Sequence, residues 1–208
     1  MFGSIRLVIG FIFLAFLVIV ISKTKASCKR ALYVVAVCFS VLMTTVLMFL
    51  PFENAFMTFD SAEEAYSYVN FGKSEATLVV EGNDSDLVVE REDDVYKYLI
   101  VPKTEDGWQV GIGSDTKMIE QRISEDISVH VYQYKDTNDY FITVLDTNGG
   151  ALEISDSCSS EFVFLETANE TAGKTFLTYY AHISEFNAEY CINANGVDII
   201  FQDGSWGE

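Results

Sequence analysis

The sequence predicts an N-terminal two-helix transmembrane hairpin, residues 1–50, followed by a mainly β domain, residues 51–208. Two uncharged apolar runs, Leu7–Ser22 and Ala31–Leu50, predict the hairpin. Short apolar segments separated by turn residues predict the β domain, as an antiparallel sandwich or barrel of about ten strands. A helix-start signal near residue 61 predicts one short helix where this domain begins.

The two apolar runs are connected by a basic loop, residues 23–30. At 1.5 Å per residue the second run covers the hydrocarbon core, and the first is shorter but bracketed by Arg6 and Lys23. Short loops rich in lysine and arginine stay on the cytoplasmic side of a membrane. The sequence therefore predicts an integral protein of the cell membrane with two spans and both termini extracytoplasmic, and with four cations as topology determinants: Lys23, Lys25, Lys29 and Arg30.

The alternative interpretation of the first run is a cleaved signal peptide. The basic cluster, however, occupies the place where a cleavage site of small residues should lie. A lipoprotein site at Cys28 is also disfavoured, because Lys25 stands at a position that such sites keep apolar.

Charge is distributed unevenly along the chain. All 31 acidic residues follow residue 50, whereas five of the 13 basic residues precede it. Binding to nucleic acid needs lysine and arginine contacts with phosphate, so the sequence predicts no nucleic-acid partner. An acidic domain favours a protein or cell-wall partner that is cationic or bridged by divalent ions.

The β domain opens with a helix signal. Ser61 is an N-cap candidate, Glu64 follows it by three residues as in a capping box, and the helix is expected over residues 62–70. Strands are then expected at 76–81, 87–90, 95–101, 108–112, 127–132, 140–145, 152–154, 162–165, 175–182, 190–192 and 197–201. Asn148-Gly149 and Asn195-Gly196 predict hairpins, since Asn-Gly favours type I′ turns.

Two cysteines, Cys158 and Cys191, lie in the β domain. In an extracytoplasmic compartment they are candidates for a disulfide, and two unpaired thiols are the alternative.

The run Phe59-x-Ser61-x-x-Glu64-Ala65-x-x-Tyr68, with the segment 80–88, resembles segments of small uncharacterised membrane-anchored proteins of Gram-positive bacteria. The resemblance covers about a fifth of the chain. It implies a location in the bacterial envelope and brings no activity with it.

The sequence contains none of the motifs of hydrolases, metalloproteases or phosphate-binding loops, and it predicts no enzymatic activity and no cofactor. For Ca²⁺, the weak candidate is the turn with Asn83, Asp84 and Asp86, although Val88 stands where an EF-hand needs glycine. The expected function is that of a membrane-tethered extracytoplasmic interaction domain with an acidic surface. The alternative is a carbohydrate-binding or glycan-processing envelope protein that uses its tyrosines and an unassigned carboxylate pair.

Overall fold

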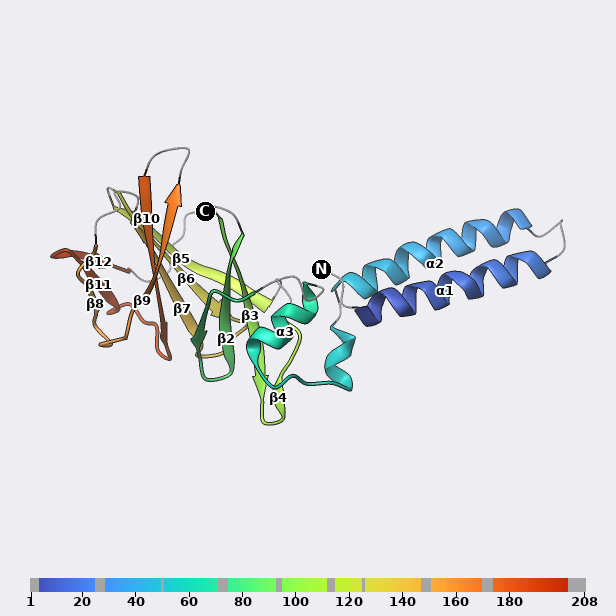
Figure 1. Cartoon of the computed structure of the whole chain (residues 1–208), viewed down its shortest axis with the longest axis horizontal. Helices are drawn as coiled ribbons and strands as arrows, with labels where there is room; N and C mark the ends of the chain where they lie inside the picture. Colours follow the sequence, from blue (N-terminus) through green and yellow to red (C-terminus); the bar gives the residue numbers. More distant parts are fainter. Residues whose placement is uncertain are drawn as a thin grey trace.

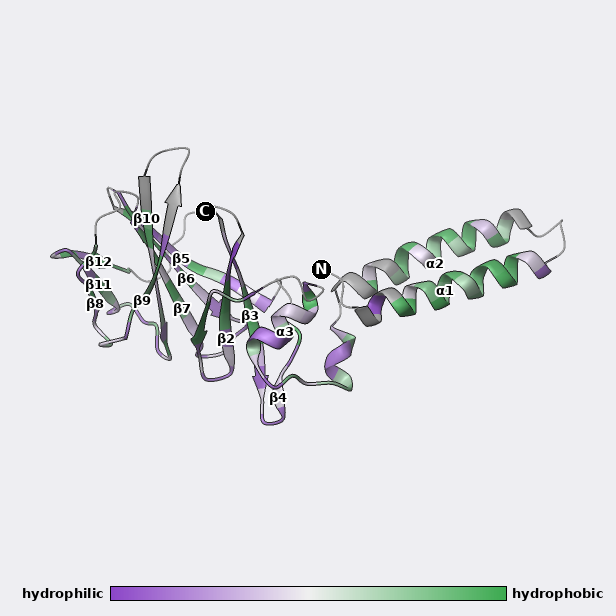
Figure 2. Cartoon of the chain, viewed as in Figure 1, coloured by the Kyte–Doolittle hydropathy of each residue, from purple (hydrophilic) through white to green (hydrophobic). Residues whose placement is uncertain are grey.

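The computed structural model describes residues 4–24, 29–49, 51–70, 75–92, 95–111, 115–124, 126–146, 151–169 and 174–201. Helices α1 (Ser4–Lys23) and α2 (Lys29–Phe49) form an antiparallel hairpin that projects away from the β domain (Figure 1). The rings of Phe13 and Phe39 pack at 5.1 Å between their centroids and join the two helices. Both helices consist largely of hydrophobic residues (Figure 2). Apolar side chains elsewhere on both are exposed, among them Phe11 and Val35.

The transmembrane assignment of this hairpin is wrong. Within the described parts of the chain, no helix combines the length and the apolar character that crossing a membrane requires. Both helices include cations, since α1 contains Arg6 and α2 begins with Lys29 and Arg30. Arg6, expected at a membrane interface, is instead buried against Glu53 of the following segment. The predicted two-span membrane partnership and the cell-membrane localisation with extracytoplasmic termini are corrected by the same finding.

The segment after the hairpin carries two short helices, the 3₁₀ turn η2 (Phe52–Ala55) and α3 (Ala62–Val69). The helix start at Ser61 is confirmed, because its Oγ accepts a hydrogen bond from the Glu64 backbone N–H at 3.2 Å. The Glu64 carboxylate accepts from the Asp60 N–H instead of the N-cap N–H of a standard capping box. Apolar residues at helical spacing, Ala62, Ala65, Tyr66 and Val69, are buried on one face of α3.

The strands form three antiparallel sheets within the described residues. The first has the order β1-β2-β3-β4, the second β5-β6-β7-β10-β9 and the third β12-β11-β8. Their bounds are β1 Leu78–Glu81, β2 Ser85–Glu92, β3 Val95–Thr104, β4 Gly107–Trp108, β5 Thr116–Ser124, β6 Ile127–Tyr134, β7 Tyr140–Asp146, β8 Ile154–Asp156, β9 Val163–Asn169, β10 Lys174–Ile183, β11 Cys191–Ala194 and β12 Val197–Ile200.

The sheets stack in layers with α3 on the outside of the first (Figure 1). Helix α3 packs on Val88, Leu99 and Val101 of the four-stranded sheet. The other face of that sheet, with Leu87 and Ile100, meets the five-stranded sheet. The expected antiparallel β domain is thus confirmed, and its form is a stack of three sheets instead of one sandwich or a closed barrel.

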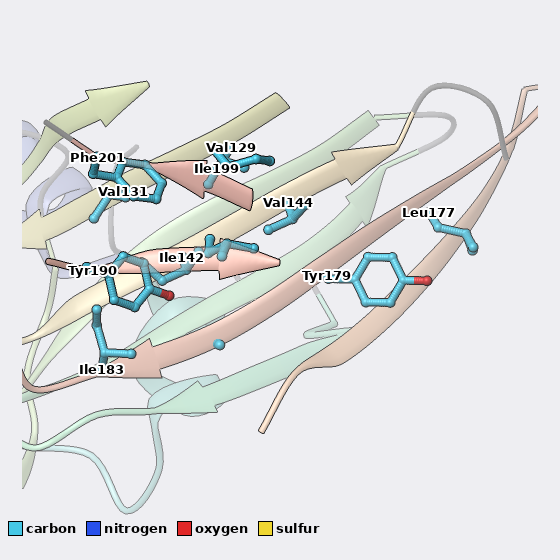
Figure 3. Close-up of a cluster of buried hydrophobic side chains, with 12 residues drawn as sticks. Val129, Val131, Ile142, Val144, Leu177, Tyr179, Ile183, Tyr190, Ile199 and Phe201 are labelled. Carbon is cyan, nitrogen blue, oxygen red and sulfur yellow. The ribbon is translucent and has the colours of Figure 1, made fainter. Parts of the chain in front are cut away.

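The five-stranded sheet buries side chains on both faces, because residues alternate between the two sides of a strand. On β7, Phe141 faces the four-stranded sheet, whereas Ile142 and Val144 face the three-stranded sheet. Figure 3 shows the second of these cores, where Tyr190, Ile199 and Phe201 of the outer layer lie over β6, β7 and β10. This sheet is therefore the centre of the domain.

One predicted hairpin forms and another does not. Asn195 and Gly196, with φ of 51° and 81°, join β11 to β12 in the turn that Asn-Gly favours. The strands on either side of Asn148-Gly149, which lies outside the described residues, belong to different sheets, since β7 pairs with β6 and β10 while β8 pairs with β11. That hairpin prediction is wrong.

Candidate functional site

Four tyrosines gather between the four-stranded and five-stranded sheets, and we name them the tyrosine cluster: Tyr96, Tyr98, Tyr132 and Tyr180. They come from β3, β6 and β10, on the faces that the two sheets turn toward each other. The rings of Tyr98 and Tyr132 lie 4.9 Å apart between centroids. The Tyr96 hydroxyl donates to the Glu166 carbonyl on β9 at 3.1 Å. The cluster thus joins three strands across one sheet interface.

The phenols of Tyr132 and Tyr180 in this cluster stay protonated. Burial raises the pKa of Tyr132 well above its usual value, and the neighbouring Tyr98 phenol raises it further. Burial likewise raises the pKa of Tyr180, with added effects of Tyr96 and Tyr98. Tyr132 and Tyr180 therefore offer neutral hydroxyl groups, and the cluster offers aromatic faces, which together suit ligands with both apolar and polar surface.

A polar and exposed margin borders the cluster on β5 and β6. The His130 ring stacks on Tyr132 at 6.2 Å, and its Nε2 lies 3.1 Å from Nε2 of Gln121. Burial lowers the pKa of His130, so its imidazole is neutral at neutral pH. Tyr98 is 44% exposed and Met118, opposite Tyr132 on the edge strand, is 52% exposed. An incoming ligand can reach the cluster from this side.

The edge strand β5 carries a β-bulge next to this margin, between Met118 and Glu120. A cavity of about 190 Å³ is lined there by residues 118–121. The bulge turns Met118 toward the tyrosine cluster and buries Glu120, which contacts Arg122 at 3.5 Å, on the opposite face.

A second polar site lies where the β1–β2 turn meets the five-stranded sheet. The fully buried Asp139 carboxylate accepts hydrogen bonds from the backbone N–H groups of Asn83 at 2.8 Å and Asp84 at 2.7 Å. It also accepts from the Ser85 hydroxyl at 2.9 Å and contacts Nε2 of His182 at 2.8 Å. Burial alone would raise the pKa of Asp139, but the bonds from His182, Asn83, Asp84 and Ser85 together lower it to about 2.

The serine, histidine and aspartate at this site do not form a catalytic triad. A nucleophilic serine needs a hydrogen bond to the histidine that removes its proton. Here Ser85 and His182 both bond to the same Asp139 carboxylate, and Ser85 is buried. The arrangement fastens one sheet to the next.

The turn predicted as a weak Ca²⁺ candidate is part of this junction. The backbone of Asn83 and Asp84 is bound by Asp139, and the buried Asp86 carboxylate accepts from the Gly82 N–H and from Nε1 of Trp108. In the portions of the chain that the structure describes, no three histidine, cysteine, aspartate or glutamate side chains converge as metal ligands do. The Ca²⁺ site at this turn stays a prediction.

Five exposed carboxylates lie in three loops at the same end of the domain, and we call this set the acidic loop end: Glu81, Asp84, Glu105, Asp106 and Asp136. The three loops are held together, since Lys103 N–H donates to the Asp84 carbonyl at 2.9 Å and Asp139 binds the β1–β2 turn. Nearby cations already have partners. Lys135 pairs with Asp115 at 3.2 Å, and Lys103 lies 5.4 Å from the Trp108 ring.

Cys158 and Cys191 carry free thiols in the structure. Of the residues predicted to set topology, Lys23 ends α1 and Lys29 and Arg30 begin α2, so they lie at the end of the hairpin away from the β domain (Figure 1). Lys25 lies outside the described residues.

Sequence reasoning pointed to the tyrosines of the β domain as a group but did not connect Tyr132 and Tyr180 with Tyr98, His130 or Gln121. The available signal is the alternation of Tyr96 with Tyr98 on one strand and of His130 with Tyr132 on another, which puts each pair on one face. Comparison of the chain with family models, with curated proteins and with solved structures finds no significant match.

Proposed function

We propose that the β domain is a binding module that presents an acidic surface to a cationic protein partner. The observation that carries the proposal is the acidic loop end, where loops from two sheets carry exposed carboxylates and are held together by hydrogen bonds. Carboxylates in one such set attract a lysine-rich or arginine-rich surface and speed its association.

The cations of the domain support the same partner. Lys135 and Arg122 are each compensated by a carboxylate of the chain itself, Asp115 and Glu120. They therefore offset little of the negative field that the exposed carboxylates create. Asp139 supplies rigidity below the loops, because its bonds to Asn83 and Asp84 fix the β1–β2 turn in place.

A lysine-rich peptide tests the proposal, with calorimetry at low and at physiological salt. Replacing the five carboxylates of the acidic loop end with their amides should weaken binding at least about tenfold at low salt. The matched control neutralises five exposed carboxylates on and around the three-stranded sheet: Glu153, Glu161, Glu185, Glu189 and Asp198. Equal losses in the two variants would mean that only net charge matters, and no binding by the wild type at low salt would refute the proposal.

A second function, carbohydrate binding, is favoured by the tyrosine cluster and its margin. Tyr98 is exposed beside Tyr132, and neutral His130 and Gln121 lie next to them. An aromatic face with neutral hydrogen-bonding groups suits the apolar face and the hydroxyls of a sugar ring.

An oligosaccharide of β-1,4-linked N-acetylglucosamine is the probe for this second function, followed by NMR or tyrosine fluorescence. The Tyr98→Ala variant should lose the response, whereas Phe164→Ala, which removes another exposed aromatic side chain, should keep it. No response of the wild type at millimolar probe, or equal losses in both variants, would remove carbohydrate binding at this cluster.

A further inference from the structure

The ladder between β8 and β11 brings the segments that carry the two cysteines of the β domain together. Ile192 is opposite Asp156 and Asn193 is opposite Ser155, so the same register places Cys191 opposite Ser157. Two hydrogen bonds confirm that continuation: Ser157 N–H donates to the Cys191 carbonyl at 2.9 Å, and Cys191 N–H donates to the Ser157 hydroxyl at 3.2 Å. Cys158 is therefore the next residue after the one that faces Cys191.

The chain turns sharply at Cys158. Ser159 has a φ of 57°, its N–H donates to the Asp156 carbonyl, and the Asp156 carboxylate accepts from the Ser160 N–H at 2.7 Å. In an uninterrupted ladder Cys158 would be opposite Tyr190, whose side chain is buried in the core. Because the ladder ends here, the Cys158 side chain is exposed instead.

Cys191 also faces away from the core. It pairs with Ile200 on β12, and Ile200 is 58% exposed, while the alternate residue Ile192 is buried in the core. Both thiols also lie around one side chain, the Tyr190 phenol, whose pKa is raised by burial and by Asp156 and further by these two cysteines. Directly opposite residues on neighbouring antiparallel strands are about 4.5–5.5 Å apart between Cα atoms. Cys158 is one residue beyond the position opposite Cys191, and a rise of about 3.3 Å along the strand gives a separation of about 6 Å between the two Cα atoms, within the range that disulfides require.

We propose that Cys158 and Cys191 form a reversible disulfide, which is reduced in this structure. The bond would link the β8–β9 connection covalently to β11. The oxidant is a small-molecule disulfide such as oxidised glutathione. One cysteine thiolate attacks it, forms a mixed disulfide and releases one glutathione thiolate. The second cysteine thiolate then attacks the mixed disulfide and releases the other glutathione. Two thiol protons pass to solvent, one disulfide of the oxidant is reduced and one disulfide of the protein is formed.

The location decides what the bond would do. The connection between β8 and β9 carries the chain from the three-stranded sheet to the five-stranded sheet, and Phe162 within it packs on the core between them. The bond closes a loop that includes β9 and β10 and so restricts the unfolded chain. The oxidised protein should therefore hold the outer sheet more firmly on the domain.

The test uses the full chain, incubated with oxidised glutathione and then digested without reductant. The expected product contains one cross-linked peptide that joins Cys158 to Cys191, with a mass about 2 Da below the sum of its two reduced peptides. The melting temperature should rise by about 5–10 °C and return to its starting value after reduction.

Single replacements provide the controls. Cys158→Ser and Cys191→Ser should each lose both the cross-link and the rise in melting temperature, whereas Cys38→Ser, on the exposed surface of α2, should keep both. Glutathione adducts that persist on either cysteine with no cross-linked peptide would overturn the proposal. So would a cross-link that leaves the melting temperature unchanged. Neither outcome depends on the acidic loop end, so this test is separate from that of the proposed function.

Discussion

Arg6 of α1 and Glu53 of η2, 47 residues apart, form a buried bidentate ion pair with distances of 2.6 Å from Nε to Oε1 and 2.9 Å from Nη2 to Oε2. The guanidinium also lies 5.6 Å from the Phe52 ring, and the Tyr68 hydroxyl donates to Glu53 at 3.5 Å. Arg6 is 5% exposed and Glu53 is fully buried. One interaction therefore connects the first turn of the hairpin to the segment that precedes α3.

Glu53→Gln should destabilise the protein by about 3–5 kcal/mol, because the Arg6 charge would stay buried without its counter-charge. The double variant Arg6→Met/Glu53→Leu should recover most of that loss, since neither charge then remains. Urea unfolding measures both, with Glu63→Gln on the exposed face of α3 as the control. If the double variant is as unstable as Glu53→Gln, the ion pair stabilises the protein by more than the neutralisation of two buried charges.

Acid should weaken the junction at Asp139. The pKa of this carboxyl is lowered from 3.8 to about 2 in the folded protein. Its ionisation therefore stabilises the folded state fully above about pH 4, and this stabilisation is lost as the pH falls through 2. The Asp139→Asn variant lacks this pH-dependent stabilisation at every pH. The difference in unfolding free energy between wild type and variant should narrow by about 2 kcal/mol from pH 5 to pH 2.

The matched control for that experiment is Asp136→Asn, an exposed residue of the same β6–β7 turn. The unfolding free energy of this variant should be close to that of the wild type at neutral pH. If Asp139→Asn differs from wild type by the same amount at both ends of the range, Asp139 is not the group that titrates.

Two glycine replacements should have opposite effects. A Cβ on Gly82 would overlap the Ser85 carbonyl oxygen and press on Phe141 and Asp139, so Gly82→Ala should cost about 1–3 kcal/mol. A Cβ on Gly10 in α1 meets nothing within 4 Å, and Gly10→Ala should stabilise the helix by about 0.5–1 kcal/mol. Thermal melts rank the two variants against wild type, and the reverse order would contradict the packing of the β1–β2 turn.

Replacing phenylalanines on the two sides of the five-stranded sheet by alanine should lower the free energy of unfolding by unequal amounts. Phe141→Ala empties a fully buried site between two sheets and should cost about 3–5 kcal/mol. Phe164→Ala, at a residue 59% exposed on β9, should cost less than about 1 kcal/mol. Denaturant midpoints provide the comparison, and similar losses would mean that Phe164 is covered in solution.

Local signals were sufficient for some elements. The helix start at Ser61 was predictable because its capping bond to Glu64 joins residues only three apart in the sequence. The hairpin at Asn195-Gly196 was predictable because its turn needs positive φ at both residues, which Asn and Gly adopt readily. The strand β5 was not predicted, since the bulge between Met118 and Glu120 interrupts the alternation that identifies a strand. The Asn148-Gly149 hairpin failed because the flanking strands find better partners far along the chain.

The candidate sites depend on contacts that no short window of sequence contains. Asp139 binds Asn83 at a separation of 56 residues, and Tyr98 meets Tyr132 only after two sheets have stacked. The transmembrane prediction rested on the apolar runs and on the cations that flank them, and it took no account of a burial partner for Arg6 within the chain.

Because β6, β7 and β10 have neighbouring strands on both sides and a packed layer on both faces, the opening of either outer layer leaves them hydrogen-bonded. Their backbone amides should be the last in the chain to exchange with deuterium, with free energies of opening near that of global unfolding. The amides of β4 and β12, at sheet edges, should exchange through smaller local openings. The side chains of the adjacent residues Phe141 and Ile142 pack on different layers, so NMR signals of these two side chains should show the order in which the layers come apart.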